Sequence, residues 1–441
     1  MAAHALNRLA FGARPADPAA VEKMGVERWV ARQLEPASIA ENPELESRLA
    51  SMKTLSLSTG ELADQYPPPQ AQKRTQGTNP AAGKRPVFTV QKELTEQKLV
   101  RAVMSERQLN EVLTDFWFNH FNVFLEKGPV RYLTTSYERD AIRPHVLGKF
   151  RDLLGATAAH PAMLYYLDNW QSISNEAGEK LARFRKGQNR ARGLNENYGR
   201  ELLELHTLGV DGGYTQQDVV EVARCFTGWT IRGDGAAQSG RLAIYGGHFH
   251  FEPRMHDRGE KVVLGVKIPA GGGVEDGQRV LDIVARHPST ARFISRKLAM
   301  RFVADDPPES LIDRMARTFT KTGGDLKAVM KTMLESREFW SEGAYQAKLK
   351  SPLELVASAL RASGSEVEHG LGLASILQQM GQPLYRKQEP TGYSNNGEEW
   401  LSSNALLARM NFAVALEKNR VPGVRVADAA VNVGAPEFQR R

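Results

Sequence analysis

The spacing of apolar residues constrains the fold most, because it repeats the period of an α-helix through most of the chain. Apolar residues recur at i, i+3 and i+4 in successive stretches that are separated by proline, glycine or polar residues. These stretches are 4–34, 92–124, 134–170, 194–209, 215–229, 277–302, 309–322, 326–340, 352–362 and 402–416. The pattern predicts a mainly α fold made of many helices.

Local signals predict where some of these helices begin or break. The pattern in 4–34 favours two short helices, and 134–170 favours two helices that break before Pro144 and Pro161. Thr215, followed three residues later by Asp218, resembles a capping box that starts the next helix.

One region departs from the helical period. "LAIYGGHFHF" and "KVVLGVKI" are rich in β-branched and aromatic residues, and "EPRMHDRGE" separates them. This arrangement predicts one small β-hairpin at about 242–267. Two other regions, about 55–90 and 171–193, are polar and poor in apolar residues, and they are predicted to be long mobile inserts.

Length and composition limit the class of protein. A chain of 441 residues is long for one core, so we expect one large domain or two fused lobes. The net charge of +7 tolerates an anionic partner, but it is less concentrated than in most nucleic-acid-binding proteins, and none is predicted. The single cysteine, Cys225, excludes an intrachain disulfide and a thiolate metal cluster. No apolar run is long enough for a membrane span.

The N-terminal sequence "MAAHALNRLAFG" lacks the charged and apolar regions of a signal peptide. As it stands, the sequence indicates a cytoplasmic protein. Helical periodicity nevertheless starts almost at Met1, which is expected if an upstream leader has been lost through a misplaced start codon. A periplasmic or exported protein is the alternative.

The most unusual stretch is "LNENYGRELLELHTLG", residues 194–209, which mixes acids, amides and arginine with leucines. On a regular helix four of its polar residues fall within about 100° of each other; these are Asn197, Arg200, Glu201 and Glu204. His206 lies nearly opposite, so the two acids and His206 cannot ligate one metal ion. Position 203, where a Glu-x-x-His motif needs its acid, is Leu203.

Two interpretations of this polar stripe remain open. In the first it is a salt-bridged face in which Arg200 pairs with Glu204. In the second it lines a cleft, where Glu201 or Glu204 is an acid or base and Asn197 positions a substrate.

Other polar residues extend the candidate site. In "FWFNHFNVF", Asn119 and His120 lie among aromatics, so they are either satisfied core groups or substrate-positioning groups. Asp168 opposes the dipole at a helix C-terminus, which indicates a tight turn or a functional acid that pairs with the stripe. Arg139 and Arg143 share a helix face and are suited to a phosphate, sulfate or carboxylate, or to pairing with those acids.

A metal site is a weak alternative. It would use His248, His250, His256 and Asp257, because alternate strand residues face one side. The sequence has no glycine-rich phosphate loop, no Gly-x-Ser-x-Gly elbow and no His-Glu-x-x-His motif. It indicates no cofactor and no oligomeric state.

Several ordered blocks together resemble a known family. They include "FWFNHF", "RDAIRPHVLGKFRDLL", "PAMLYYLDN", "NENYGRELLELHTLG", "FTGW", "HPSTARFISRKLAMRF" and "YRKQEPTGY". The sequence resembles the bacterial domain-of-unknown-function family 1800 (DUF1800) from about Ala5 to Leu416. The resemblance implies a single helical domain over 1–416, followed by a C-terminal tail over 417–441. It also implies a bacterial, often exported protein, often encoded beside a phosphatase-like secreted protein that is a candidate partner.

The resemblance implies no activity and no catalytic residues, so the functional hypotheses rest on the residues. The first is a hydrolase-like envelope enzyme that acts on an anionic or carbohydrate-like substrate. Its proposed catalytic acids are Glu201, Glu204 and Asp168, and its proposed substrate-binding residues are Asn119, His120, Arg139, Arg143, Asn197 and Arg200. The second is a non-catalytic helical scaffold or partner-binding protein whose polar stripe is a buried salt-bridge network.

Overall fold

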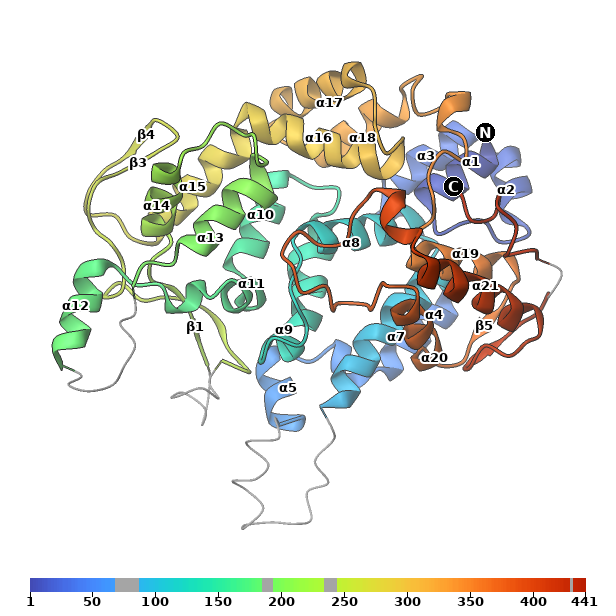
Figure 1. Ribbon diagram of the computed structural model, residues 1–441, viewed down its shortest axis with the longest axis horizontal. Coiled ribbons are helices and arrows are strands. Elements are labelled where there is room, and N and C mark those ends of the chain that lie inside the picture. Colours follow the sequence, from blue (N-terminus) through green and yellow to red (C-terminus); the bar gives the residue numbers. More distant parts are fainter. Residues whose placement is uncertain (68–86, 185–192, 234–243, 429–430) are drawn as a thin grey trace, which may run out of the picture.

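The computed structural model describes residues 1–67, 87–184, 193–233, 244–428 and 431–441, and it is built mainly of α-helices (Figure 1). The expected mainly α fold is therefore confirmed. Within these residues, the β-structure consists of three sheets of two antiparallel strands each. No helix in the described ranges has both the length and the apolar content needed to cross a membrane.

The helices of the first half are α1 (Ala2–Leu9), α2 (Asp17–Met24), α3 (Val26–Gln33), α4 (Pro43–Ser51), α5 (Thr59–Gln65), α7 (Phe88–Met104), α8 (Gln108–His120), α9 (Val130–Ser136), α10 (Phe150–Ala159), α11 (Pro161–Tyr166), α12 (Asn175–Phe184) and α13 (Glu196–Glu201). The second half contains α14 (Gln216–Cys225), α15 (Val274–Arg286), α16 (Pro288–Phe302), α17 (Glu309–Lys321), α18 (Leu326–Leu334), α19 (Pro352–Ala362), α20 (Leu371–Gln379) and α21 (Ser403–Glu417). The strands are β1 (Trp229–Arg232), β2 (His248–Phe251), β3 (Lys261–Val263), β4 (Val266–Ile268), β5 (Glu366–Val367) and β6 (Val424–Arg425). Two segments, Tyr137–Ile142 and Leu202–Thr207, are π-helical.

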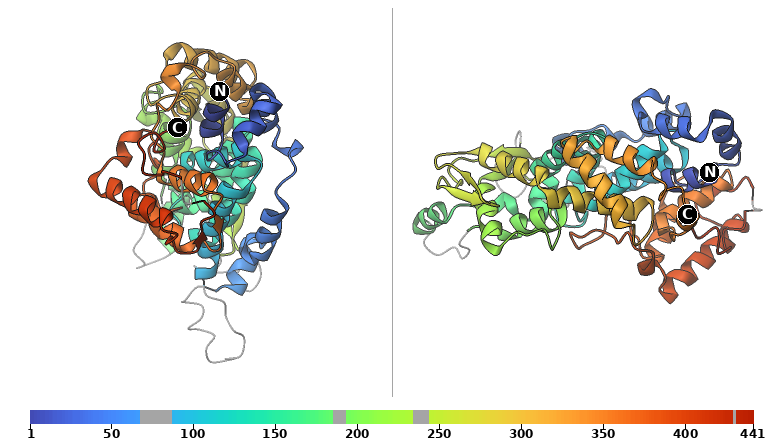
Figure 2. Two further views of the ribbon diagram at one scale, coloured as in Figure 1. Left: turned by 90° about the vertical axis from the view of Figure 1, so that its right-hand side faces the viewer. Right: turned by 90° about the horizontal axis from the view of Figure 1, so that it is seen from above.

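One hydrophobic core extends from α1 to residues that follow α21. Trp117 of α8, Phe121 directly after this helix and Phe150 of α10 are fully buried in it. Their ring centroids lie 6.0–6.3 Å apart, within the usual range for packed aromatic pairs. The two chain ends lie near each other on one side of the molecule (Figures 1 and 2). The core therefore joins the first and last helices of the chain.

Several helix ends follow the local sequence signals. Thr215 and Asp218 form the expected capping box at the start of α14, and α11 begins at Pro161 after a break at His160. The first stretch holds three helices, α1 to α3, instead of the two expected. The reason is Gly25, which has a φ of 92° and separates α2 from α3 by a single residue.

The two polar inserts are partly helical. Helix α5 lies within 55–90 and α12 lies within 171–193. The remaining parts of these predicted loops, 68–86 and 185–192, lie outside the described residues. Residues 417–441 contribute β6 and several apolar side chains to the core.

The strands between residues 244 and 268 do not pair as the sequence suggested. The two segments expected to pair with each other have separate partners: β2 pairs with β1, and β3 pairs with β4. The turn between β3 and β4 explains this. Its residues Leu264 and Gly265 both have positive φ, 51° and 77°, as a tight two-residue hairpin turn requires. The segment "KVVLGVKI" therefore forms a hairpin of its own.

The helix that carries the polar stripe changes type within its length. It is α-helical to Glu201 and then π-helical, and the backbone N–H of Leu208 donates to the carbonyl of Leu203, five residues back, at 2.8 Å. A wheel of 100° per residue therefore does not extend beyond Glu201. The α-helical part packs closely on α14 because Gly199 has no side chain; a Cβ there would lie 2.8 Å from a backbone oxygen of α14.

A buried set of ionised groups connects α7, α8 and the π-helical segment Tyr137–Ile142. We call it the Glu138 network, and its members are Lys98, Arg101, Glu111, Asp115, Glu138 and Arg143. It holds three cations and three carboxylates. Because the charges are balanced and lie close together, each buried ion has a partner, which is the condition for keeping such groups out of water.

Glu138 lies at the centre of this network and is 2% exposed. Its carboxylate lies 3.5 Å from Lys98 and 3.4 Å from Arg143, and it accepts hydrogen bonds from Gln97 (2.8 Å) and Tyr385 (2.7 Å). Burial opposes ionisation, but Lys98 and Arg143 outweigh it and hold the pKa of Glu138 at about 2. The carboxylate therefore stays ionised throughout the physiological range.

We expect Glu138→Gln to lower the free energy of unfolding by about 3–5 kcal/mol, because it leaves Lys98 and Arg143 buried with too few anions. Urea denaturation at pH 7 measures the change. The matched control is Glu366→Gln, which removes an exposed ion pair to Arg425 and should cost less than about 1 kcal/mol. Equal effects in both variants would show that the network does not hold these helices together.

Candidate functional site

Residues 383–396, which we call the 383–396 loop, cross the C-terminal end of α8 and bring several sequence motifs together. The Asn119 side chain donates to the Tyr393 carbonyl and accepts from the Tyr393 N–H, both at 2.7 Å. Asn122 donates to two further carbonyls of the loop at 3.0 and 2.9 Å, and the Tyr166 hydroxyl donates to a third at 2.6 Å. Asn119 therefore holds this loop in place.

The loop is also fixed at Tyr385, whose hydroxyl donates to Glu138 and whose carbonyl accepts from the backbone N–H of Leu125 at 2.9 Å. At its other end Gly392 has a φ of 71°, and a Cβ there would lie 2.2 Å from the Asn119 carbonyl oxygen. Only glycine allows so close an approach. The loop thus depends on the same buried carboxylate as α7 and α8.

Beneath this loop lies a cavity of about 60 Å³. Asn119, Asn122, Tyr385 and Tyr393 form part of its wall. Its charged and amide lining also includes Lys98, Asp115, Arg301, Glu354, Asn395 and Arg441. A polar cavity of this size is large enough for a few waters or one small ligand group.

Glu201 and Glu204, the two acids of the polar stripe, are both half-buried. Glu204 accepts a hydrogen bond from the Tyr214 hydroxyl at 3.0 Å. No hydrogen bond or ion pair from the described part of the chain reaches the Glu201 carboxyl. Burial and the nearby charge of Glu204 raise the pKa of Glu201 above its ordinary value, although Arg200 acts in the opposite direction.

The ion pair expected between Arg200 and Glu204 is not formed among the described residues. Arg200 instead donates to the Gln216 side chain at 2.7 Å, and Gln216 donates to Glu196. Asn197 is exposed on the same helix. The stripe is therefore a row of polar groups with little mutual charge pairing.

The third proposed acid, Asp168, has surroundings that differ from those of these two. Asp168 is exposed, has a φ of 60°, and forms an ion pair with Lys127 at 2.8 Å. Its left-handed backbone conformation places it in the tight turn that ends α11, in accord with one of the two interpretations of this residue. Tyr166, two residues earlier, is close enough for Glu201 to contribute to the raised pKa of its hydroxyl, which burial chiefly causes.

His120 and His206 form a buried pair on the opposite side of the stripe helix. The His120 ring nitrogen Nε2 lies 3.1 Å from the His206 carbonyl oxygen, and the ring centroids are 6.3 Å apart. Two ring nitrogens, His120 Nδ1 and His206 Nε2, are buried and have no hydrogen-bond partner within the described ranges. Burial and the charge of Lys297 lower the pKa of both rings, that of His206 to about 3.

Arg139 and Arg143, proposed to hold an anion together, have different surroundings. Arg139 pairs with Asp140 and donates to the carbonyls of Leu55 and Leu57. Arg143 belongs to the Glu138 network. Both guanidinium groups therefore already contact acceptors of the protein.

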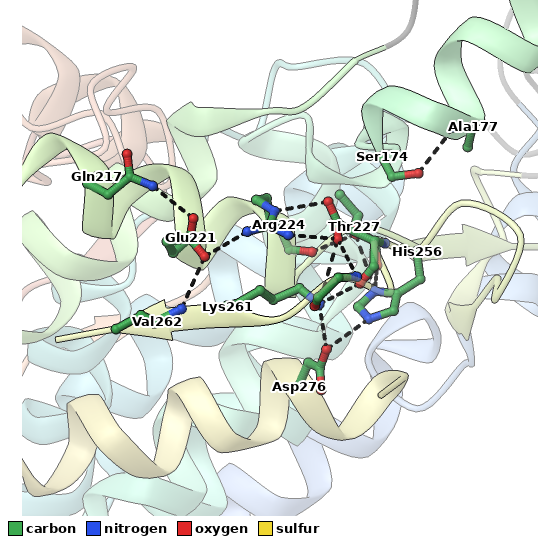
Figure 3. Close-up of polar contacts among 12 residues, drawn as sticks. Ser174, Ala177, Gln217, Glu221, Arg224, Thr227, His256, Lys261, Val262 and Asp276 are labelled. Atoms are coloured by element: carbon green, nitrogen blue, oxygen red, sulfur yellow. Dashed lines mark hydrogen bonds and ion pairs between the residues drawn. The ribbon is translucent and has the colours of Figure 1, made fainter. Parts of the chain in front are cut away.

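The structure does not support the possible metal site, and His256 instead lies among Thr227, Lys261 and Asp276 (Figure 3). His256 is bound through one ring nitrogen to Thr227 and through the other to Asp276 at 3.1 Å, and Asp276 also pairs with the fully buried Lys261 at 2.8 Å. Asp257 pairs with Arg224. Among the described residues, no group of three histidine, cysteine or acidic side chains is placed to hold a metal ion.

The charged residues of the cavity were not singled out from the sequence. Glu354 occurs in "SPLE", where Ser351 and Glu354 do form a capping box at the start of α19. The capping box alone is enough to explain Glu354 at this position, so nothing in the sequence indicated its ion pairs with Arg301 and Arg441. These partners are separated along the chain, so no spacing pattern could have connected them.

The family model described as "Protein of unknown function (DUF1800)" matches residues 4–438. The chain therefore belongs to this family, as its motifs suggested. No curated protein and no solved structure matches it.

The buried histidines predict a specific dependence of stability on pH. An unfolded histidine binds a proton near pH 6.5, whereas His206 in the folded protein resists protonation to about pH 3. Stability should therefore fall as pH drops below 6.5, by up to about 1.4 kcal/mol per pH unit for each such residue. Urea unfolding at pH 7.0, 6.0 and 5.0 should show a smaller loss for His206→Gln than for the natural protein. The exposed His369 is the control, and His369→Gln should retain the natural slope.

Proposed function

We propose that this member of the DUF1800 family is a hydrolase-like enzyme of the bacterial envelope, with Glu201 as general acid and Glu204 as its partner carboxylate. The observation that carries the proposal is the state of Glu201. It is a half-buried carboxyl with a raised pKa and no partner among the described residues. Evolution towards stability alone would pair or remove such a group.

A raised pKa suits a carboxyl that must deliver a proton near neutral pH. Two features raise it here, partial burial and the charge of Glu204. The Glu204 carboxyl accepts a hydrogen bond from Tyr214, and in this proposal it activates water or stabilises positive charge. Two acids held in different environments therefore support different roles in one reaction.

The surroundings support an anionic or carbohydrate-like polymer as the substrate. Both carboxyls are partly exposed, so a long chain has access to them. Asn197 and Arg200 lie on the same helix and offer amide and cationic donors. Asp168 is exposed and paired with Lys127, so in this proposal it contacts substrate and does not transfer a proton.

A second candidate function is a partner-binding protein, and one observation favours it. Helix α21 exposes an apolar side that includes Leu406, Leu407, Met410 and Val414, with exposures of 42–65%. Exposed apolar patches of this kind mark interaction sites. The candidate partners are a second copy of this chain and the neighbouring phosphatase-like secreted protein.

The first test compares Glu201→Gln with the natural protein. Gln keeps the shape of the side chain and removes its charge. We therefore expect the melting temperature at pH 7 to stay equal or rise, and the free energy of unfolding to increase by up to about 1 kcal/mol. Reducing-end release from peptidoglycan and from polyuronates should fall at least 100-fold, because the proton donor is lost. The control is Glu196→Gln, an exposed acid of the same helix, which should keep the activity. A destabilised Glu201→Gln would instead identify the charge as structural.

The second test addresses the apolar side of α21. If a second copy covers it, light scattering after gel filtration should give the mass of two chains. The variant Met410→Glu should then give the mass of a single chain. A buried charge in such an interface is costly, so one substitution suffices. A single-chain mass for the natural protein would rule out self-association through α21.

A further inference from the structure

A second group of buried charges lies where the two chain ends approach each other, and its charges do not balance. We call it the terminal cation cluster. Its six cations are Arg8, Arg301, Lys348, Lys350, Arg409 and Arg441, each at most 6% exposed. The electrostatic neighbours that stabilise them are two carboxylates, Asp305 and Glu354.

The Glu138 network on the other side of the same cavity provides the comparison. It has as many carboxylates as cations, whereas among the described side chains the terminal cation cluster has six cations and two carboxylates. A buried cation without an anion costs several kcal/mol. An excess of this kind is therefore unexpected in a site that only holds helices together.

Glu354 already forms ion pairs with more than one cation of the cluster. Its oxygen Oε1 contacts Arg301 and lies 2.9 Å from Arg441, while Oε2 accepts from the backbone N–H of Ser351. The Arg441 nitrogen Nη1 and the Arg8 nitrogens Nε and Nη1 are buried and have no hydrogen-bond partner among the described residues. Donors of a guanidinium that lack an acceptor indicate that an acceptor is missing.

The excess charge also affects the lysines of the cluster. Burial, with Arg441 and Arg409, lowers the pKa of Lys350 to about 7, although Glu354 opposes the shift. Burial, with Arg441, lowers the pKa of Lys348 to about 8. An added anion would relieve this repulsion.

The cavity beneath the 383–396 loop opens onto this cluster, because Arg301 and Arg441 line it. Asn395 adds an amide to the wall. Glu354 and Asp115 also line it, but each is neutralised, Glu354 by the two arginines and Asp115 by Lys98 at 3.0 Å. We propose that this cavity binds one small oxyanion of the phosphate type, held by the guanidinium groups of Arg301 and Arg441.

The size of the cavity fits this class of ligand. The cavity has room for a phosphate group. Arginine presents paired donors in the geometry that phosphate oxygens accept. The oxyanion is either free phosphate or the terminal group of a larger ligand whose remainder lies outside the loop. This inference uses none of the stripe acids, so it stands or falls separately from the proposed hydrolase.

The test is a titration of the purified full-length protein with inorganic phosphate at constant ionic strength, followed by calorimetry and by thermal melting. We expect saturable binding of one phosphate per chain and a rise in melting temperature. Arg441→Gln should weaken binding at least tenfold, because it removes the unpartnered donors. The matched control is Arg425→Gln, an exposed arginine on β6, which should bind as the natural protein does.

Asn395→Leu provides a second variant that narrows the cavity without removing a charge, and it should also abolish binding. It keeps the test decisive if Arg441→Gln does not fold. Methyl phosphate and glucose 6-phosphate distinguish the two sources. If these two esters bind more weakly than inorganic phosphate, the ligand is the free ion. If either ester binds more tightly, the ligand is a phosphorylated molecule. The proposal would be overturned by an absence of saturable binding, or by variants Arg441→Gln and Asn395→Leu that bind phosphate as tightly as the natural protein does.

Discussion

The arrangement of the central helices depends on one buried carboxylate, that of Glu138. It connects Lys98 of α7, Arg143 after the first π-helical segment, and Tyr385 of the 383–396 loop. Each of these partners belongs to a different part of the chain, and each would be costly to bury alone. The ion therefore specifies which segments meet, which the apolar contacts around Trp117 cannot do because they have no direction. The position of the loop, and of the cavity beneath it, follows from this interaction.

The two charged groups around the cavity differ in what they are suited for. The Glu138 network is balanced and rigid, which is what a structural element requires. The terminal cation cluster has more cations than side-chain carboxylates, which is the basis for the proposed oxyanion site. The polar stripe differs from both, since no ion pair reaches Glu201 from the described part of the chain and this residue is partly open to solvent. The proposed oxyanion binding and the proposed acid–base chemistry are therefore assigned to separate places in this fold.

The sequence predicted local features well and long-range contacts poorly. The helical period, the capping box at Thr215 and the break at Pro161 depend on neighbours within a few residues, and all three were found. The strand pairing was missed because β1 and β2 are separated along the chain, and the turn at Leu264 and Gly265 favours a shorter hairpin. The polar stripe could be singled out because its residues lie within one short stretch of the sequence. The cavity could not, because Lys98, Arg301 and Arg441 come from distant segments, and nothing local to them indicates that they meet.

The π-helical segment at Leu202–Thr207 has a consequence for how the family can vary in length. A π-helical turn contains one residue more than the α-helical turn it replaces. The segment Leu202–Thr207 therefore spaces its side chains differently from a regular α-helix, in which successive residues are about 100° apart. Glu204 on this segment is half-buried, and His206 is buried. Loss of one residue there would restore an α-helical turn and change the positions of the side chains within the segment relative to those that flank it. The length of this block is therefore as restrictive as its composition.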